Sequence, residues 1–378
     1  MAILNEEQKM LRDAAKAWVA QKSPVSRFRK LRDSGANDGF ESELWAEICT
    51  MGWPGILVPE AYGGSGLGYS TMGLVLEETG RTLTASPLFA TSVVTVSALL
   101  LAGNDNQKNV WLPQLASGET LGTLAVDEGA HHAPDRIALA AAHDGKRWKL
   151  TGTKTFVLDG GAADLFVVAA RTGDEPGAEN GITLFLLPGN PPGLTRQKLK
   201  SVDSRDVANL HLDGVLVEQG GVLGTVNHGY SILAALLDRA RATLAAEMLG
   251  AATQSFEVTL DYLKTRAQFG QVIGTFQSLQ HRAAKMFAEL ELARSCVEAA
   301  LSAIDRNAND VPQLCSLAKA RAGDTWHLIS NEMVQMHGGI GMTDAHDSGL
   351  YLKRARVAEA LFGNSTFHRD RYAKLMGY

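Results

Sequence analysis

The sequence contains little cysteine and no long apolar segment, and both absences narrow what the protein can be. Among 378 residues there are three cysteines, Cys49, Cys296 and Cys315, which lie far apart in helix-like segments. Thiols this few and this scattered indicate reduced core residues rather than a disulfide framework or a metal cluster. No apolar run reaches the ~18 residues that a membrane-spanning helix requires, so we expect no membrane segment.

An excess of positive charge is also missing. The chain has 36 Lys and Arg against 41 Asp and Glu, a net charge of −5, which provides no basic surface for nucleic acid or an anionic membrane. Its first residues lack the basic-then-apolar order of a signal peptide. Asn5 and Gln8 instead have the spacing of a capping box, which predicts the start of a helix. We therefore expect a cytoplasmic protein without nucleic-acid partners.

What is present is an ordinary globular composition arranged in three stretches. Hydrophobic residues make up 45% and charged residues 20%, and 378 residues exceed the ~100–200 of a single domain. Apolar residues recur at helical spacing up to Gly118 and again after Gly229, whereas short segments rich in β-branched and large apolar residues lie between. We predict an α+β fold with three domains: an N-terminal helical domain over 1–118, a middle β domain over 119–226 and a C-terminal four-helix bundle over 227–378.

The middle stretch predicts an antiparallel β-barrel or sandwich. Strand-like segments such as Leu165–Ala170 and Ile182–Leu187 are separated by Gly, Pro, Asp and Asn rather than by helix-length segments. A parallel, doubly wound sheet needs such helices between its strands. No G-x-G-x-x-G follows a strand either, so a nicotinamide Rossmann enzyme is disfavoured. Thr172–Asn180, rich in Gly, Asp and Glu, is expected to be a loose loop.

The strongest motif joins two predicted helices in the C-terminal stretch. It reads Arg266-Ala-Gln-Phe-Gly-Gln-Val-Ile-Gly-Thr-Phe-Gln-Ser-Leu-Gln280 and brings a guanidinium, an aromatic ring and amides into one short segment. Arginine forks match pyrophosphate oxygens, and planar rings and amides suit an adenine or a ribose. Taken alone, the stretch is explained equally well by an arginine that caps a helix beside an ordinary turn.

Two further motifs have both a functional and a structural explanation. Gln335-Met-His-Gly-Gly-Ile-Gly-Met-Thr343 contains three glycines that let a backbone pass close to a ligand, although glycine also ends ordinary helices. Asp238-Arg-Ala-Arg241 opens a helix after Gly229. Its charges fit either a nucleotide-bearing substrate or a solvated helix face.

Together, and in this order within a helix–strand–helix chain, these motifs resemble the acyl-CoA dehydrogenase family. Pro59–Gly68 is similar to that family's PExxGGxGL stretch, Arg266–Gln280 to its RxxFGxxIxxFQxxQ stretch and Gln335–Gly341 to its QxxGGxG stretch. The resemblance covers nearly the whole chain. It implies an FAD-dependent enzyme that introduces an α,β double bond into an acyl-CoA thioester and passes electrons to an electron-transfer flavoprotein or a similar acceptor.

The resemblance also implies roles for individual residues. Those expected to bind FAD are Arg266, Phe269, Gln277, Gln335, Gly338, Gly339, Phe156 and Asp127. The first six would hold the FAD of a neighbouring subunit, so a homo-oligomer, a tetramer or a dimer, is part of the expected site. Phe156 matches an aromatic position that covers the isoalloxazine ring, and Asp127 lies in a loop that normally reads Thr-Glu-Pro. Asp238 and Arg241 match positions that contact coenzyme A.

The chain departs from the family pattern at the catalytic base. The family removes the α-proton of the thioester with a glutamate, usually that of an Ile-Tyr-Glu-Gly-Thr stretch. Here the stretch is Ala360-Leu-Phe-Gly-Asn-Ser-Thr366, so Phe362 or, after a shift of one residue, Gly363 takes that position. Other members carry the glutamate just before the arginine that matches Arg241, where this chain has Ala240. None of these three residues accepts a proton.

The flavin-side stretch departs as well, because Phe156-Val-Leu-Asp159 replaces Trp-Ile-Thr-Asn. The catalytic residue is therefore left unknown. Asp127, Glu128, Asp238 and Glu247 are candidates, and each is also explained as a solvated or salt-bridged acid. His131-His132 has no third ligand at a recognisable spacing, so no metal site is expected.

Three functions stay open at this point. The first is a dehydrogenase with an unusual base. The second is a base-lacking subunit that pairs with a base-bearing paralogue in a hetero-oligomer for bulky or sterol-derived acyl-CoA. The third is a reduced-flavin monooxygenase on the same fold, which needs no α-carbon base. The missing glutamate favours the second and third, and Asp238 with Arg241 favours the first two.

Overall fold

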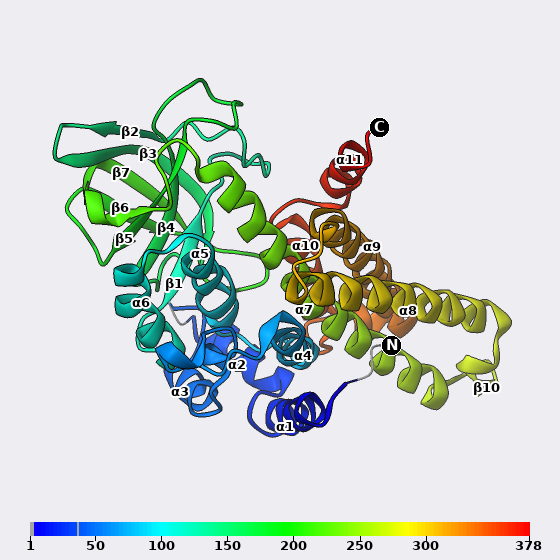
Figure 1. Ribbon diagram of the computed structural model, residues 1–378. Helices are drawn as coiled ribbons and strands as arrows, with labels where there is room; N and C mark the ends of the chain where they lie inside the picture. The colour runs from blue at the N-terminus through cyan, green and yellow to red at the C-terminus, as the bar shows by residue number, and fades with distance from the viewer. Residues whose placement is uncertain (1–3, 36–37) are drawn as a thin grey trace. The chain divides into compact units, whose positions relative to one another are not determined.

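A computed structural model describes residues 4–35 and 38–378, with helices toward both ends of the chain and a sheet between them (Figure 1). The backbone divides into two compact units. One unit comprises the described residues of Met1–Lys30, Tyr69–Thr84 and Arg241–Tyr378, and the other comprises those of Leu31–Gly68 and Ala85–Ala240. The three-domain boundaries at 118/119 and 226/227 stay a prediction.

The second unit contains an eight-stranded sheet. Its strands are β1 (Gly122–Ala125), β2 (Ala140–His143), β3 (Arg147–Leu158), β4 (Leu165–Arg171), β5 (Ile182–Pro188), β6 (Leu194–Lys198), β7 (Val207–Glu218) and β8 (Val222–Leu223). The strand order is β6-β7-β3-β2-β4-β5-β8, and β1 pairs with β4. The β domain is confirmed, but the sheet is mixed rather than wholly antiparallel, because β1 and β2 each pair with β4 in parallel.

The core of this sheet comes from alternating apolar side chains on its strands. Trp148, Phe166 and Phe185 are buried there, and the Trp148 and Phe185 rings meet edge-on at 5.5 Å between centroids. Strand β3 pairs with β7 in a register that shifts twice, between Leu150 and Gly152 and between Lys154 and Val157. Such irregularities re-aim the side chains of a strand. Here the second shift contains Phe156.

The helices of the same unit include α3 (Ser42–Thr50), the π-helix η3 (Phe89–Thr95), α5 (Val96–Ala102), α6 (Asp105–Ser117) and the part of α7 (Gly229–Thr265) up to Ala240, and the residues of α2 (Val25–Ser34) are divided between the two units. All seven residues of η3 are buried, and the Thr91 hydroxyl accepts from the Gly122 N–H of β1 at 3.1 Å. Helix α6 begins at Asn104 with a reciprocal capping box and ends at Gly118, which has a left-handed backbone. Both ends of α6 therefore follow from its own sequence.

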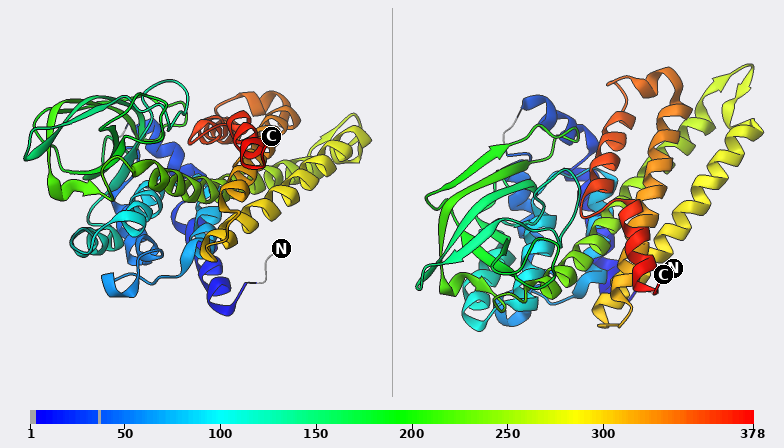
Figure 2. Two further views of the ribbon diagram at one scale, coloured as in Figure 1. Left: turned by 45° about the horizontal axis from the view of Figure 1, so that its top comes forward. Right: turned by 90° about the horizontal axis from the view of Figure 1, so that it is seen from above.

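The first unit is helical. It contains α1 (Glu6–Lys22), α4 (Gly68–Arg81, from Tyr69), the second part of α7 (Gly229–Thr265), α8 (Gln277–Asp305), α9 (Val311–His337), α10 (Ser348–Ala360) and α11 (Ser365–Leu375). Helix α9 packs against α8, α10 and α11, and Figure 2 shows α8 and α9 side by side. The predicted capping box is present, since Asn5 and Gln8 bond each other's backbone. Among the described residues, no helix is long and apolar enough to cross a membrane.

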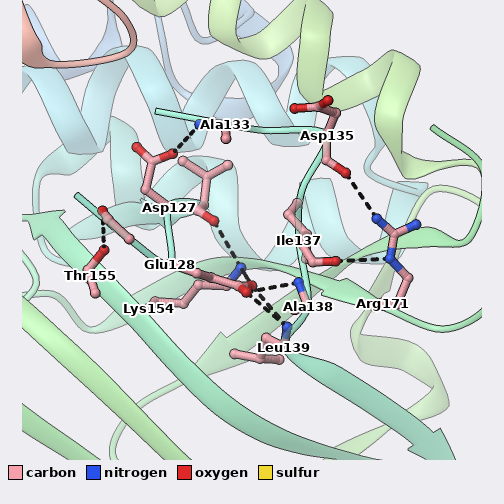
Figure 3. Close-up of polar contacts among 12 residues, drawn as sticks. Asp127, Glu128, Ala133, Asp135, Ile137, Ala138, Leu139, Lys154, Thr155 and Arg171 are labelled. Carbon is pink, nitrogen blue, oxygen red and sulfur yellow. Dashed lines mark hydrogen bonds and ion pairs between the residues drawn. The ribbon is translucent and has the colours of Figure 1, made fainter. Parts of the chain in front are cut away.

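A buried ion pair fixes the loop between β1 and β2 (Figure 3). The Lys154 ammonium is fully buried and donates to Glu128 Oε1 at 2.6 Å and to the Val126 carbonyl at 3.0 Å. The Glu128 carboxylate also accepts from the Ala138 and Leu139 N–H groups at 2.8 and 3.0 Å. Burial lowers the pKa of Lys154, and the Glu128 carboxylate opposes that shift. The pair thus joins both ends of the loop to β3.

We predict that Glu128→Ala destabilises this unit by about 3 kcal/mol, because it leaves a buried ammonium without its counter-charge and two backbone donors without an acceptor. Urea unfolding followed by tryptophan fluorescence measures the change. Glu175→Ala, which removes an exposed acid from another loop of the same unit, is the control and should be neutral. Equal stability of the two variants would contradict the role of the pair.

Candidate functional site

In the sheet-containing unit, Asp127 and Phe156 lie close together. The Thr155 N–H donates to the Asp127 carbonyl at 2.8 Å, which places Asp127 beside the residue that precedes Phe156. Phe156 has a left-handed backbone, with φ of 52°, and its N–H donates to the Asn209 side chain at 3.1 Å. Its side chain is exposed: the residue's relative exposure is 54%, whereas neighbouring Val157 is buried. The structure thus places the backbone of Asp127 beside β3, next to the residue that carries the exposed ring.

The Asp127 carboxylate is held by a histidine. Its two oxygens lie 2.9 and 3.0 Å from His132 Nδ1, and Oδ1 also accepts from the Ala133 N–H at 3.4 Å. In the His131-His132 pair, His132 is therefore the residue that contacts a carboxylate, that of Asp127. Among residues 4–35 and 38–378, no group of three or more His, Cys, Asp and Glu is arranged to hold a metal ion.

In the helical unit, Arg266 begins a small hairpin between α7 and α8. Strands β9 (Ala267–Gln268) and β10 (Gln271–Val272) are joined by Phe269 and Gly270, whose φ angles are 55° and 80°. Two consecutive positive φ angles are typical of a type I′ hairpin turn. Phe269 is 88% exposed at the tip. Within the described part of the chain, the exposed Arg266 guanidinium has no carboxylate partner.

The glycine-rich turn lies at the same end of this unit. Gly338 begins the 3-10 helix η6 (Gly338–Met342), directly after α9. The Tyr262 hydroxyl donates to the His337 carbonyl at 3.4 Å, and the two rings stack at 4.4 Å between centroids. Tyr262 lies one turn before Arg266, and its carbonyl accepts from the Arg266 N–H. The Arg266 and Gly338 motifs, 72 residues apart in sequence, are therefore joined through Tyr262 and His337.

The surface around Gly338 is open. A Cβ added at either Gly338 or Gly339 would meet no atom within 4 Å. Ile340 and Met342 nearby are 48% and 79% exposed, and Gln335 and Gln277 are exposed as well. Exposed apolar side chains beside open glycines are typical of a surface that another molecule covers.

The His337 ring also lies against the His346 ring, at 4.2 Å between centroids and tilted by 40°. Its Nδ1 lies 2.7 Å from the Met333 carbonyl. Burial lowers the pKa of both histidines. Each neighbour modifies this shift: His346 lowers the pKa of His337 further, and for His346 the nearby Asp347 acts in the opposite direction.

Asp238 and Arg241 lie on α7 and are both buried. Arg241 Nε donates to the Phe362 carbonyl at 3.0 Å, and its guanidinium lies 5.4 Å from the centre of the Phe367 ring. Its side chain thus supports the loop between α10 and α11, where the sequence predicted the base position. Phe362 has a left-handed backbone with φ of 55° and is buried.

Lys319 supports the same loop, and the sequence motifs did not predict this role. Its buried ammonium donates to the carbonyls of Glu359 and Gly363 at 3.0 and 3.1 Å. Burial, with Arg241 adding to it, lowers the pKa of Lys319 to about 7. A lysine within the apolar stripe of α9 is the signal that would have revealed it, because a buried lysine requires specific partners.

Three of the four acids that could replace the usual catalytic base are paired with basic side chains. Glu247 forms a buried ion pair with Arg354, at 2.7 and 3.0 Å. Glu128 is paired with Lys154, and Asp127 with His132. Asp238, the fourth candidate, is buried on α7. The catalytic base therefore stays unassigned.

Comparisons with known proteins agree along the chain. Models of the N-terminal, middle and C-terminal domains of acyl-CoA dehydrogenases match residues 5–119, 128–215 and 227–377. An acyl-CoA dehydrogenase of Bacillus subtilis (strain 168) is 30% identical over 370 residues, which cover 96% of this chain and 94% of the relative.

Solved structures share the whole fold. A chain in the structure of the electron transferring flavoprotein of Acidaminococcus fermentans superposes with a TM-score of 0.93 at 26% identity, covering 100% of this chain and 99% of that one. A variant of the steroid ACAD Tcur3481-Tcur3483 gives a TM-score of 0.88 at 30% identity, with 98% of both chains covered. The chain therefore belongs to the acyl-CoA dehydrogenase family, whose members are FAD-dependent oxidoreductases.

Proposed function

We propose that this chain binds FAD with the Arg266 hairpin and the Gly338–Gly339 turn of one subunit, and with Asp127 and Phe156 of another. The observation that carries the proposal is the connection of the two motifs through Tyr262 and His337 at one end of the helical unit. Gln277 and Gln335 belong to the same proposed surface.

The residues at this surface fit the chemistry of the cofactor. A guanidinium without a carboxylate partner suits a pyrophosphate, which it binds through two parallel hydrogen bonds. Open glycines let a ligand approach the backbone, and the exposed rings of Phe156 and Phe269 offer flat apolar faces to a planar group. When bound, FAD supplies the hydride acceptor that the dehydrogenation requires.

We further propose that the chain lacks the usual carboxylate base. Neither Ala240 nor Phe362 can take a proton, and Leu158 stands where the family's flavin-side threonine is expected. A subunit of this kind fits a hetero-oligomer in which a base-bearing paralogue performs the proton abstraction. The name of the steroid ACAD, which pairs Tcur3481 with Tcur3483, supports such an arrangement for bulky acyl-CoA substrates.

The proposed partners follow from the same reasoning. An acyl-CoA substrate would approach Asp238 and Arg241, and Arg241 would act partly through the loop backbone that it holds. An electron-transfer flavoprotein is the proposed acceptor, in keeping with the Acidaminococcus structure. A tetramer or dimer would cover the exposed Phe269, Ile340 and Met342.

We predict that Arg266→Ala loses FAD and weakens the oligomer together, because one guanidinium would bind a pyrophosphate at a subunit boundary. Absorbance at the flavin band and mass by light scattering measure both effects. Arg306→Ala, at the exposed end of α8, is the control and should retain both. An Arg266→Ala variant that keeps stoichiometric FAD and an unchanged oligomer would contradict the proposed role of Arg266 in binding FAD.

We predict that the chain alone dehydrogenates straight-chain acyl-CoA poorly, since loss of a general base typically costs ~10²–10⁴-fold in rate. Acyl-CoA should still perturb the flavin spectrum, because binding and proton abstraction use different residues. Phe362→Glu, and separately Ala240→Glu, should restore part of the activity. Anaerobic flavin bleaching measures each variant, and rapid bleaching by the unmodified chain would show that another acid acts as the base.

We predict that bound FAD is released more readily as the pH falls below 6.5, the ordinary pKa of histidine. The folded state lowers the pKa of His337 and His346, so it favours their neutral forms. Their contribution to stability is therefore present above 6.5 and is lost as the pH falls toward the lowered values. Fluorescence of released FAD measures the effect. His337→Phe keeps an aromatic ring at this position without a titrating group, so it should reduce the pH dependence of FAD release. A pH profile of FAD release identical to that of the unmodified chain would contradict the role of His337.

A further inference from the structure

The 343–348 segment, which connects the η6 turn to α10, lies against the glycine-rich turn of the proposed flavin surface. The buried Ser348 hydroxyl donates to the Gly341 carbonyl at 2.7 Å. The His346 ring lies 4.2 Å from the ring of His337, the residue directly before the first glycine of the turn. The path of the glycine-rich turn therefore depends on where the 343–348 segment lies.

The hydrogen bond of His346 defines its protonation. The Ser348 N–H lies 3.1 Å from His346 Nδ1 and can only donate, so this nitrogen accepts and carries no proton. His346 is therefore uncharged in this arrangement, in keeping with its pKa, which burial lowers. Its contact with the turn is thus made by a neutral ring, and the charges of the segment belong to its two carboxylates, Asp344 and Asp347.

Both carboxylates of the segment bind one arginine of α2. The Arg29 guanidinium donates to Asp347 Oδ1 at 2.6 Å, to Asp344 Oδ2 at 3.2 Å and to the Asp344 carbonyl. Arg29 belongs to the same compact unit as the segment, although the last residues of α2 belong to the other unit. The Arg29 side chain is 22% exposed, and those of Asp347 and Asp344 are 42% and 68% exposed.

An exposed ion pair alone contributes little to stability, because water screens it and ordering two side chains costs entropy. The Arg29 contacts differ in two respects. One planar guanidinium binds two carboxylates and a backbone carbonyl, which fixes an orientation that a single pair does not. Its two acidic partners are also three residues apart, so binding both of them sets the path of the backbone between them. That backbone carries His346.

We propose that Arg29 is a positioning residue of the flavin surface, which holds the 343–348 segment against the glycine-rich turn and so fixes Gly338 and Gly339 for the cofactor. This inference rests on the proposed function, in which these two glycines contact FAD. Gly338 has a φ of 63° and a ψ of −136°. Glycine has no Cβ to confine its backbone, so contacts from outside the turn must fix this conformation.

The test measures the dissociation constant of FAD for the full chain, reconstituted from its FAD-free form, in a double-mutant cycle of Arg29→Gln and Asp347→Asn. We expect Arg29→Gln to weaken FAD binding about tenfold, because it removes hydrogen bonds between charged groups. In the Asp347→Asn background the same substitution should have a smaller effect, since part of its action passes through that carboxylate. The Asp347 side chain makes no capping bond to α10, so Asp347→Asn reports on the contact with Arg29.

Two further variants separate the contacts of Arg29 from its charge. Lys30→Gln removes the same charge from the neighbouring, exposed position of α2, so it is the matched control and should leave FAD binding unchanged. Arg29→Lys keeps the charge but loses the planar fork, so it should recover part of the FAD affinity that Arg29→Gln loses. If Arg29→Gln does not fold, Arg29→Lys enters the cycle with Asp347→Asn in its place, with a smaller loss of affinity expected.

A measurement without flavin tests the positioning itself. In the FAD-free chain, Arg29→Gln should speed hydrogen exchange of the backbone N–H groups over 338–348, and Lys30→Gln should not. Unchanged exchange in Arg29→Gln, unchanged FAD affinity in that variant, or an equal loss of affinity in Lys30→Gln would each overturn the inference. An unmodified chain that binds no FAD would instead refute the proposed function, and the two failures are thereby distinguished.

Discussion

The buried Glu128–Lys154 ion pair is the constraint on which the sheet-side part of the site depends. Removing two charges from water is costly, and such a pair is tolerated only when further hydrogen bonds satisfy its remaining lone pairs and protons. The Ala138 and Leu139 N–H groups and the Val126 carbonyl do so here. A hydrophobic pair would fill the same space without binding those backbone groups. What the ion pair adds is therefore the path of the loop, which places Asp127 against β3.

Three phenylalanines with left-handed backbones mark the positions that the family resemblance identified. A bulky side chain rarely adopts positive φ, and each instance costs of order 1–3 kcal/mol. Phe156, Phe269 and Phe362 do so, with φ of 52°, 55° and 55°. Different contacts hold each one: the Asn209 side chain at Phe156, the hairpin with Gly270 at Phe269, and Arg241 at Phe362. Such backbone strain persists where the surrounding structure enforces it, and it concentrates at functional sites.

The parts of the fold that sequence could predict are those set by local chemistry. The Asn5–Gln8 capping box and the helical spacing of the C-terminal stretch depend on residues three or four positions apart, and the capping box and the helices α8 and α9 are present in the structure. The parallel pairing of β1 with β4 matches Gly122 with Leu165, and no local pattern encodes a partner so distant. Lys319 was overlooked because a stripe is recognised by its apolar members, whereas the role of a buried cation depends on the carbonyls that surround it. Contacts to FAD stay predictions, because they involve groups from outside one chain.

The loop between α10 and α11 is held through its backbone by two buried cations. Arg241 from α7 and Lys319 from α9 bind its carbonyls, and neither contact involves the side chain at position 362. The left-handed turn at Phe362 and Gly363 is thus held through its carbonyls by the two buried cations. The charge of Arg241 lowers the pKa of Lys319, so the two cations repel each other, and the loop carbonyls provide hydrogen-bond acceptors for both. If position 362 is the base position, as proposed, phenylalanine there changes the proton chemistry of the loop without removing the contacts that hold its backbone.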